Sequence, residues 1–240
     1  MNRRKALITG ASRGIGLAIA REFAMAGYDL VLTCINSGTK LDKIALELMN
    51  SYNISCDVFS GDLSSFSVVG QLFQSISELD VLVNNAGVAH FSLLQDTTAE
   101  DWDRIIGTNL NSAFYCCKMA IPLMLHKKSG KIINISSVWG EYGAAVEVAY
   151  STSKGGLNAF TKALAKELAP SNIQVNAISC GMIDTDMNKC FSESDLSEII
   201  EAIPSGRMGK PEEVARLCLQ LCTGNNYLTG QIITLDGGWM

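Results

Sequence analysis

A tyrosine and a lysine lie one helical turn apart in the second half of the chain. Tyr150 and Lys154 are separated by three residues, a spacing that places both side chains on one face of a helix. An ammonium group beside a phenol favours the phenolate and lowers the phenol pKa from about 10. Such a pair can act as a general acid and base near neutral pH. The spacing alone is a weak signal, because most such pairs are solvated charges on a helix surface.

Polar residues also close two apolar segments that precede this pair. Ser136 and Ser137 follow the apolar run 132–135, and the sequence Asn-Asn-Ala-Gly at 84–87 follows the run 81–83. If both runs are parallel strands, their carboxyl ends meet at the edge of the sheet where doubly wound enzymes bind ligands. These residues therefore add polar groups to the surroundings of the tyrosine and lysine.

A glycine-rich turn joins the first apolar run to the first segment with helical periodicity. Glycines without a Cβ permit a tight bend and let backbone N–H groups approach a pyrophosphate, and the N-terminus of the following helix adds positive charge. At a strand-to-helix junction in the first βαβ unit, this pattern predicts a dinucleotide site. The candidate cofactor-binding residues of the turn are Gly10, Ala11, Ser12, Arg13, Gly14, Ile15 and Gly16.

The end of the second strand indicates which dinucleotide is bound. NAD sites usually place an Asp or Glu there, to accept a hydrogen bond from the ribose 2′-hydroxyl. The residues at 32–37 contain no acid, and Arg13 in the glycine turn can reach a 2′-phosphate bidentately. We therefore expect NADP(H), although no second basic residue follows that strand before Lys40.

Short apolar runs alternate with helix-period segments along all 240 residues. Runs without alternation are typical of strands buried on both faces, as in a parallel sheet. The pattern predicts an α/β, doubly wound (Rossmann) fold with a seven-stranded parallel sheet and helices on both faces. We expect a single domain over 1–240, with a cofactor half at about 1–90 and a catalytic half at about 91–240. One long helical stretch is expected from the fourth strand to about residue 125, and the polar region 185–211 is a possible substrate lid.

Taken together, these motifs resemble those of the short-chain dehydrogenase/reductase family, and the resemblance covers essentially the whole chain. It implies a Ser–Tyr–Lys triad that is extended by Asn109. Tyr150 would donate a proton to the ketone oxygen, and Ser137 would hold that oxygen. Lys154 would lower the tyrosine pKa and bind the nicotinamide ribose, while Asn109 would hold a water that relays protons. The spacing of 13 residues to Tyr150 selects Ser137 over Ser136, because neighbouring residues of a strand point to opposite faces.

The resemblance also implies further cofactor contacts. Members of the family hold the adenine after the third strand, line the adenosine ribose after the fourth and contact the carboxamide after the sixth. The matching residues here are Asp62, Leu63, Asn85, Ala86, Gly87, Ile183 and Thr185. One departure is that Cys180 stands where the family usually has a proline before Gly181. We interpret it as a simple substitution, and the local backbone course is the open point.

Two substrates are compatible with the resemblance. Segments 11–16, 183–187 and 206–213 are similar to 3-oxoacyl-(acyl-carrier-protein) reductases of fatty acid biosynthesis, which dock an acidic carrier on basic residues. Lysines near the expected mouth are candidates for that role, but Ser171 replaces a usual arginine. The candidate docking residues are Lys127, Lys128 and Lys131.

Segments 136–140, 163–171 and 237–239 are instead similar to a branch that reduces an aminopentanone group on a lysine of elongation factor P. In that interpretation Glu141 and Glu147 would suit a cationic amine, although both could be solvated loop charges. A non-catalytic nucleotide-sensing module is a third hypothesis, and the complete Ser–Tyr–Lys–Asn set argues against it.

Composition excludes several other functions. With 19 Lys and Arg against 24 Asp and Glu, the net charge is −5, which disfavours nucleic acids and anionic membranes as partners. The eight cysteines and two histidines show no metal-ligand spacing, so we expect no metal. Reduced, buried thiols are typical of a cytoplasmic protein. The family resemblance implies a homotetramer.

Overall fold

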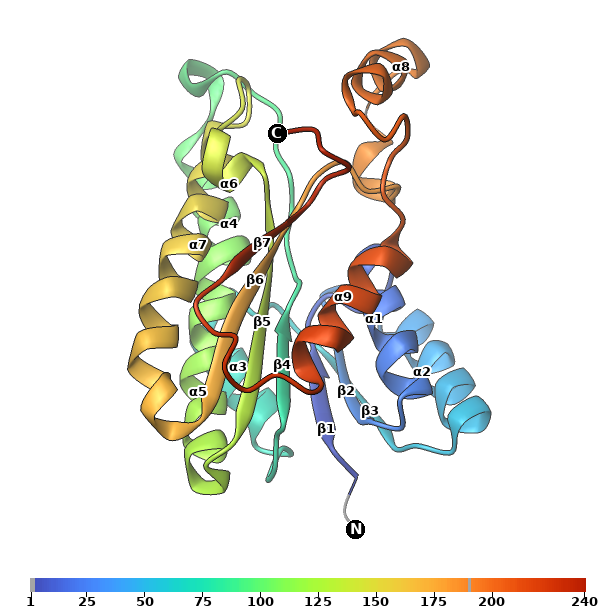
Figure 1. Ribbon diagram of the computed structural model, residues 1–240, viewed down its shortest axis with the longest axis vertical. Helices are drawn as coiled ribbons and strands as arrows, with labels where there is room; N and C mark the ends of the chain where they lie inside the picture. Colours follow the sequence, from blue (N-terminus) through green and yellow to red (C-terminus); the bar gives the residue numbers. More distant parts are fainter. Residues whose placement is uncertain (1–2, 190) are drawn as a thin grey trace.

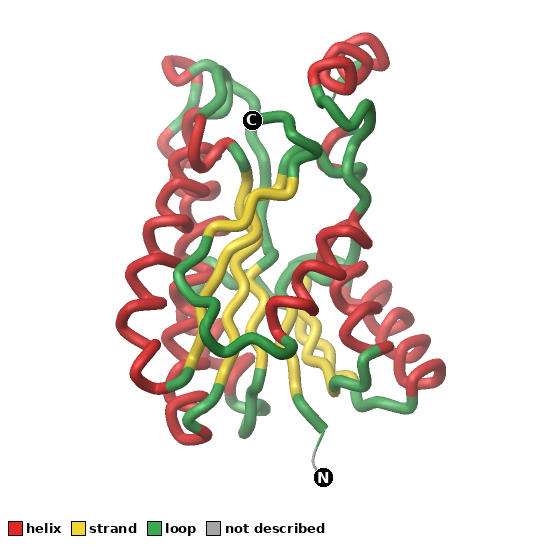
Figure 2. The backbone as a smooth tube through the Cα atoms, viewed as in Figure 1, coloured by secondary structure: helices red, strands yellow, loops and turns green. Residues whose placement is uncertain are grey.

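Seven strands form one parallel sheet in the computed structural model, which describes residues 3–189 and 191–240. Their order across the sheet is β3-β2-β1-β4-β5-β6-β7, and every neighbouring pair is parallel. The predicted doubly wound Rossmann fold with a single domain is confirmed (Figures 1 and 2). The strands are β1 (Lys5–Ile8), β2 (Asp29–Cys34), β3 (Cys56–Ser60), β4 (Val81–Asn84), β5 (Gly130–Ser137), β6 (Ile173–Cys180) and β7 (Ile232–Leu235).

Helices cover both faces of this sheet (Figure 1). On one face, residues of α1 (Gly14–Met25), α2 (Gly38–Tyr52) and α9 (Pro211–Cys222) join a hydrophobic core with β1 and β2. On the other face, α3 (Phe66–Phe73), α5 (Ser112–Lys127) and α7 (Val148–Leu168) form a second core. The two cores explain why the inner strands are continuous apolar runs: each strand buries both of its faces.

The expected single helix after β4 is wrong in detail. The chain instead forms a 3₁₀ turn η1 (Leu94–Asp96), the helix α4 (Ala99–Ile106), one π-helical turn η2 (Gly107–Asn111) and then α5. The π-turn joins α4 to α5 without an intervening loop, so the sequence from Ala99 to Lys127 reads as one helical stretch. The short helix α6 (Trp139–Tyr142) and the 3₁₀ turn η3 (Ala169–Ser171) complete the catalytic half.

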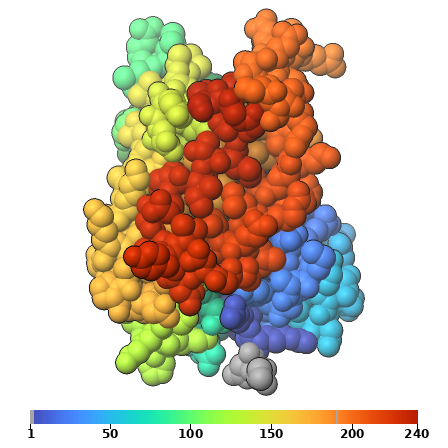
Figure 3. All heavy atoms as spheres, viewed as in Figure 1, coloured from blue at the N-terminus to red at the C-terminus, as the bar shows by residue number. Residues whose placement is uncertain are grey.

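The polar region 185–211 contains the 3₁₀ turn η4 (Asp186–Asn188) and the helix α8 (Glu193–Ala202). The two ends of this region are joined to each other beside the sheet. Gly209 N donates to Met182 O at 2.9 Å, and Asp184 N donates to Gly209 O at 2.9 Å. Helix α8 lies beyond the carboxyl edge of the sheet (Figure 1). The C-terminal tail reaches toward this edge as well, and on the face shown it lies beside the lid region (Figure 3).

The composition also led to expectations about membranes, metals and thiols. No helix among the described residues is long and apolar enough to cross a membrane, and no group of three or more His, Cys, Asp or Glu side chains in this part could hold a metal ion. Seven cysteines are buried and unpaired, as expected of reduced thiols. The eighth, Cys190, lies outside the described residues.

Candidate active site

The glycine turn between β1 and α1 is shaped by two close approaches of the backbone. A Cβ on Gly16 would lie 2.3 Å from the carbonyl oxygen of Gly10, so only glycine fits there. Gly10 itself has φ +66°, a left-handed conformation that L side chains rarely adopt. The turn therefore presents bare backbone at the N-terminus of α1, which is the geometry that accepts a pyrophosphate.

Thr9 and Asn85 hold this turn against the end of β4. The Thr9 hydroxyl accepts hydrogen bonds from the backbone N–H of Asn85 at 2.9 Å and of Ala86 at 3.0 Å. The Asn85 side-chain amide donates to the carbonyl oxygens of Thr9 at 2.9 Å and Gly10 at 3.1 Å. Asn85 thus positions the glycine turn, and so does Thr9, the residue directly before the predicted turn.

Two cations lie near the expected position of a 2′-phosphate. The Asp186 carboxyl has a lowered pKa, mainly because Lys189 hydrogen-bonds to it, and the charges of Arg13 and Lys40 lower it further. Arg13 and Lys40 therefore both lie near Asp186, although 26 residues, including the whole of β2, separate them in the sequence. Both are exposed and, among the described residues, neither forms an ion pair. Lys40 is the second basic group that the sequence did not place.

The other predicted cofactor residues follow strand ends at the same edge. Asp62 comes after β3 and accepts a hydrogen bond from Ser64 N at 2.9 Å, while Leu63 is buried in the core. At the start of the lid, a Cβ on Gly14 would lie 3.3 Å from the Thr185 methyl. The cavity between Gly14 and the lid has a volume of about 310 Å³. The structure thus brings the lid start against the glycine turn.

Ser137 and Tyr150 meet at the carboxyl end of β5. The Ser137 side chain hydrogen-bonds to the Tyr150 phenol and accepts from Trp139 N at 3.2 Å. Ser136 points elsewhere, because its hydroxyl lies 3.5 Å from the Lys154 carbonyl oxygen. The structure therefore brings Ser137 rather than Ser136 to the tyrosine, as the alternation of strand side chains predicted.

Lys154 lies beneath this pair, in a fully enclosed position. Its Nζ donates to the carbonyl oxygen of Ile135 at 2.8 Å and lies 5.6 Å from the centre of the Tyr150 ring. A Cβ on Gly87 would be 3.6 Å from this Nζ, so the loop after β4 lies close to the ammonium. Burial lowers the lysine pKa to about 8, because the charged form loses its hydration.

Asn109 lies in the middle of the π-helical turn and ties three segments together. Its side-chain oxygen accepts from Val88 N at 2.8 Å, and its amide donates to Val88 O at 2.9 Å and to the Ser153 hydroxyl at 3.0 Å. A Cβ on Gly87 would lie 3.4 Å from its side-chain oxygen. Asn109 thus fixes the loop after β4 to α7, next to Lys154. Its role in holding a relay water stays a prediction.

The electrostatics of Tyr150 differ from the expectation. Burial raises the phenol pKa above its usual value of 10; the hydrogen bond from Ser137 opposes this, and the charge of Glu147 adds to it. Desolvation of the phenolate is the largest effect on this pKa, and the role of Lys154 in lowering it stays a prediction. At neutral pH the phenol is protonated, which is the form that donates a proton.

Cys180, the departure from the family pattern, leaves the backbone course regular. Its carbonyl oxygen accepts from Val138 N at 3.0 Å, and the next residue, Gly181, donates to Leu235 O at 3.0 Å. Burial raises the pKa of the Cys180 thiol to about 12, so the thiol stays protonated and unreactive. The interpretation as a simple substitution agrees with this burial.

The three lysines considered for carrier docking lie at the wrong edge of the sheet. Lys127 and Lys128 end α5, and Lys131 is the second residue of β5, whereas Ser137 is its last. At about 3.3 Å per residue, Lys131 is roughly 20 Å from Ser137. Lys127 also pairs with Asp80 at 2.6 Å, and Lys131 donates to Asn225 O at 3.0 Å. The prediction that they flank the active-site mouth is therefore wrong.

Comparison with known proteins places this geometry in a family. A profile described as "Enoyl-(Acyl carrier protein) reductase" matches residues 10–240. The 3-oxoacyl-[acyl-carrier-protein] reductase FabG of Aquifex aeolicus is 40% identical over 237 residues, which are 97% of this chain and 95% of the relative. The chain belongs to the short-chain dehydrogenase/reductase family.

Other members of the short-chain dehydrogenase/reductase family are similar over their whole length. The uncharacterized oxidoreductase YmfI of Bacillus subtilis is 38% identical over 236 residues, 98% of each chain. The crystal structure of YwfH, an NADPH-dependent reductase involved in bacilysin biosynthesis, superimposes with a TM-score of 0.94 at 29% identity and covers 100% of this chain and 99% of YwfH. The protein is thus an oxidoreductase of this family.

Proposed function

We propose that this protein is an NADPH-dependent ketone reductase. The observation that supports it most directly is the Tyr150 phenol, which is held protonated and hydrogen-bonded to Ser137 at the ligand-binding edge of the sheet. The glycine turn, the buried Lys154 and the lid start lie around the same edge. A non-catalytic nucleotide sensor would need the glycine turn to bind its ligand, but it would not need a proton donor such as Tyr150.

The proposed mechanism assigns one task to each side chain. When bound, NADPH would supply a hydride to the carbonyl carbon. Ser137 donates a hydrogen bond to the ketone oxygen and fixes its position, and Tyr150 gives that oxygen its proton. The raised phenol pKa favours this direction, because the group is protonated when the ketone arrives. Lys154 fixes the tyrosine from below and is available to the ribose, with Asn109 holding the adjacent loop.

The preference for NADPH over NADH rests on charge. No carboxylate stands at the end of β2 to repel a 2′-phosphate, and the two unpaired cations Arg13 and Lys40 lie in that region. The pyrophosphate would rest on the backbone of Gly10 and Gly16, where a side chain would not fit. The solved structure of YwfH is titled an NADPH-dependent reductase, which is consistent with this assignment.

Two ketones are candidates for the substrate. The first is a 3-oxoacyl thioester on acyl carrier protein, reduced to the 3-hydroxyacyl form; relatives named for this activity are 36–40% identical to the chain. The second is the 5-aminopentanone modification on elongation factor P. A specific observation favours the second: the Glu147 carboxyl is buried beside Tyr150, and the candidate carrier-docking lysines lie at the opposite edge.

Assembly and location remain part of the proposal. We infer a cytoplasmic homotetramer in which the edge strand β7 is covered by a partner, because β7 is half-exposed while its neighbour β6 is buried at every position. Light scattering tests the assembly, and a monomer would contradict it.

The decisive experiment measures NADPH oxidation with acetoacetyl thioester and with aminopentanone-modified elongation factor P. We expect turnover of one of them, and Tyr150→Phe should lower that rate by about 10²- to 10⁴-fold while NADPH still binds in a fluorescence titration. NADPH binding without turnover of either substrate would support the nucleotide sensor instead. Unchanged turnover by Tyr150→Phe would refute the catalytic assignment.

A further inference from the structure

A carboxyl group is buried beside the catalytic tyrosine without a partner. Glu147 is 8% exposed, and Lys154 is the only other charged side chain of the described residues with comparable burial. Lys154 donates to a carbonyl oxygen, whereas the Glu147 carboxyl has no hydrogen bond and no ion pair within the described chain. Its charge nevertheless acts on the Tyr150 phenol three residues later. An unpaired carboxylate in a largely enclosed place costs free energy, and a cationic ligand that reached it would relieve that cost.

The loop after β4 fixes the backbone next to Glu147. The preceding residue, Val146, accepts a hydrogen bond from Ser92 N at 2.8 Å, which joins the start of α7 to the loop after β4. The neighbouring Phe91 packs edge-to-face on Phe191 of the lid, with ring centres 5.3 Å apart. The loop after β4 thus contacts both the start of α7, next to Glu147, and the segment 185–211.

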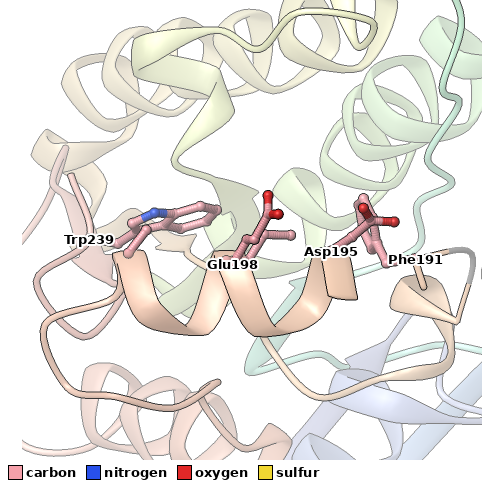
Figure 4. Close-up of a pocket in the computed structure, with 6 residues that line it drawn as sticks. Phe191, Asp195, Glu198 and Trp239 are labelled. Atoms are coloured by element: carbon pink, nitrogen blue, oxygen red, sulfur yellow. The ribbon is translucent and has the colours of Figure 1, made fainter. Parts of the chain in front are cut away.

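Aromatic and acidic residues line a cavity between the segment 185–211 and the C-terminal tail. Trp139 packs on Trp239 of the C-terminal tail at 5.1 Å between ring centres. A cavity of about 440 Å³ lies between Trp239, Phe191 and α8. The carboxylates of Asp195 and Glu198 project from α8 between these two rings (Figure 4). Aromatic faces and carboxylates are the groups that attract an organic cation.

The charge on helix α8 has one sign. The helix contains four acidic residues and no Lys or Arg. Two basic residues of the segment 185–211 are paired, Lys189 with Asp186 at 2.5 Å and Arg207 with Glu213 at 2.8 Å. Such a surface concentrates cations and repels an acidic protein.

We propose that Glu147 is the specificity-determining residue of this site and binds the ammonium group of a ketone substrate, with the acidic, aromatic face of α8 guiding that cation inward. The inference rests on the proposed ketone reduction and specifies its substrate class. Transfer of the ammonium from water to Glu147 pairs both charges in an enclosed site, where the attraction is strongest. A neutral acyl chain would leave the carboxyl unpaired.

The test compares two ketones of matched shape, 5-(trimethylammonio)pentan-2-one and 6,6-dimethylheptan-2-one, which differ in one positive charge and neither of which can cyclise through an amine. NADPH oxidation gives kcat/KM for each ketone with the full-length wild-type protein. We expect the cation to be preferred by about tenfold or more, and Glu147→Gln to remove most of that preference. Glu141→Gln, a change at an exposed carboxyl of α6, is the matched control and should retain it.

Calorimetric binding of both ketones to the NADP⁺-loaded protein separates the two hypotheses. Charge-selective binding that Glu147→Gln abolishes, without turnover, would refute ketone reduction and retain the ammonium site. Turnover of both ketones at equal kcat/KM, or a preference that survives Glu147→Gln in a variant with unchanged circular dichroism, would overturn the role of Glu147. Turnover of both ketones at equal kcat/KM would still support the assignment as a ketone reductase.

Discussion

The Nζ of Lys154 and the carbonyl oxygen of Ile135 are joined by a hydrogen bond of 2.8 Å, which ties the middle of β5 to the first turns of α7. The bond satisfies a buried cation with a fixed backbone acceptor, so the lysine is held in place before any ligand arrives. The ends of β5 and α7 that bear Ser137 and Tyr150 are thereby kept in register.

Replacement of Lys154 by methionine should therefore disable the site. Lys154→Met removes the ammonium and leaves the Ile135 carbonyl without its donor. We therefore expect kcat/KM for the ketone substrate to fall by about 10²-fold or more. Lys162→Met, at an exposed lysine of the same helix, is the control and should behave as wild type. Equal activity of the two variants in steady-state assays would contradict the role of Lys154.

Cofactor selectivity should depend on both cations near the end of β2. Arg13→Ala and Lys40→Ala each remove one charge from the proposed 2′-phosphate position, and we expect each to raise the NADPH dissociation constant by about tenfold. Affinity for NADH should stay within about twofold, since that cofactor lacks the phosphate. Parallel fluorescence titrations measure both constants, and an equal loss for NADH would show that these residues act on the fold instead.

The glycine turn provides a test with a built-in control. Gly16→Ala places a Cβ 2.3 Å from the Gly10 carbonyl oxygen, and such overpacking should cost about 1–3 kcal/mol of unfolding free energy as well as NADPH binding. Gly70→Ala in α3 meets no atom within 4 Å, so it should be neutral or stabilise by up to about 1 kcal/mol. Urea unfolding of both variants measures the difference, and similar values would refute the close approach.

Glu147 should make the folded chain less stable as the pH rises. Burial raises the pKa of its carboxyl from 4.5 to about 7, so between these values the folded state holds a proton that the unfolded state has lost. Stability therefore falls as the pH rises across this window and levels off above it. Glu147→Gln should remove this slope and be more stable than wild type at pH 8, but not at pH 4.5. Thermal unfolding at both pH values tests it, and parallel profiles of the two proteins would contradict it.

The sequence contains enough local information for most of the fold. The alternation of apolar runs and helical periods predicts the parallel sheet, and the spacing of Gly10, Gly14 and Gly16 predicts the turn that α1 begins. Strand alternation also selects Ser137 over Ser136. These inferences succeed because each depends on neighbours along the chain.

The remaining features depend on contacts between distant segments. The direction of the Tyr150 pKa shift is set by burial, which helical spacing does not reveal. Lys40 joins Arg13 only in the folded chain, where the charges of both act on Asp186. The error about the docking lysines could have been avoided from the sequence. Lys131 lies near the start of the strand that Ser137 ends, so the distance between them can be estimated by counting residues.

The segment between Met182 and Gly209 is anchored where it begins and where it ends, by the reciprocal backbone bonds at Gly209. A substitution, insertion or exchange inside it does not have to alter the strands or the nucleotide cradle. Descendants of one ancestral gene can thus inherit the same reduction chemistry and diverge in the molecules they accept, by rewriting a single surface excursion.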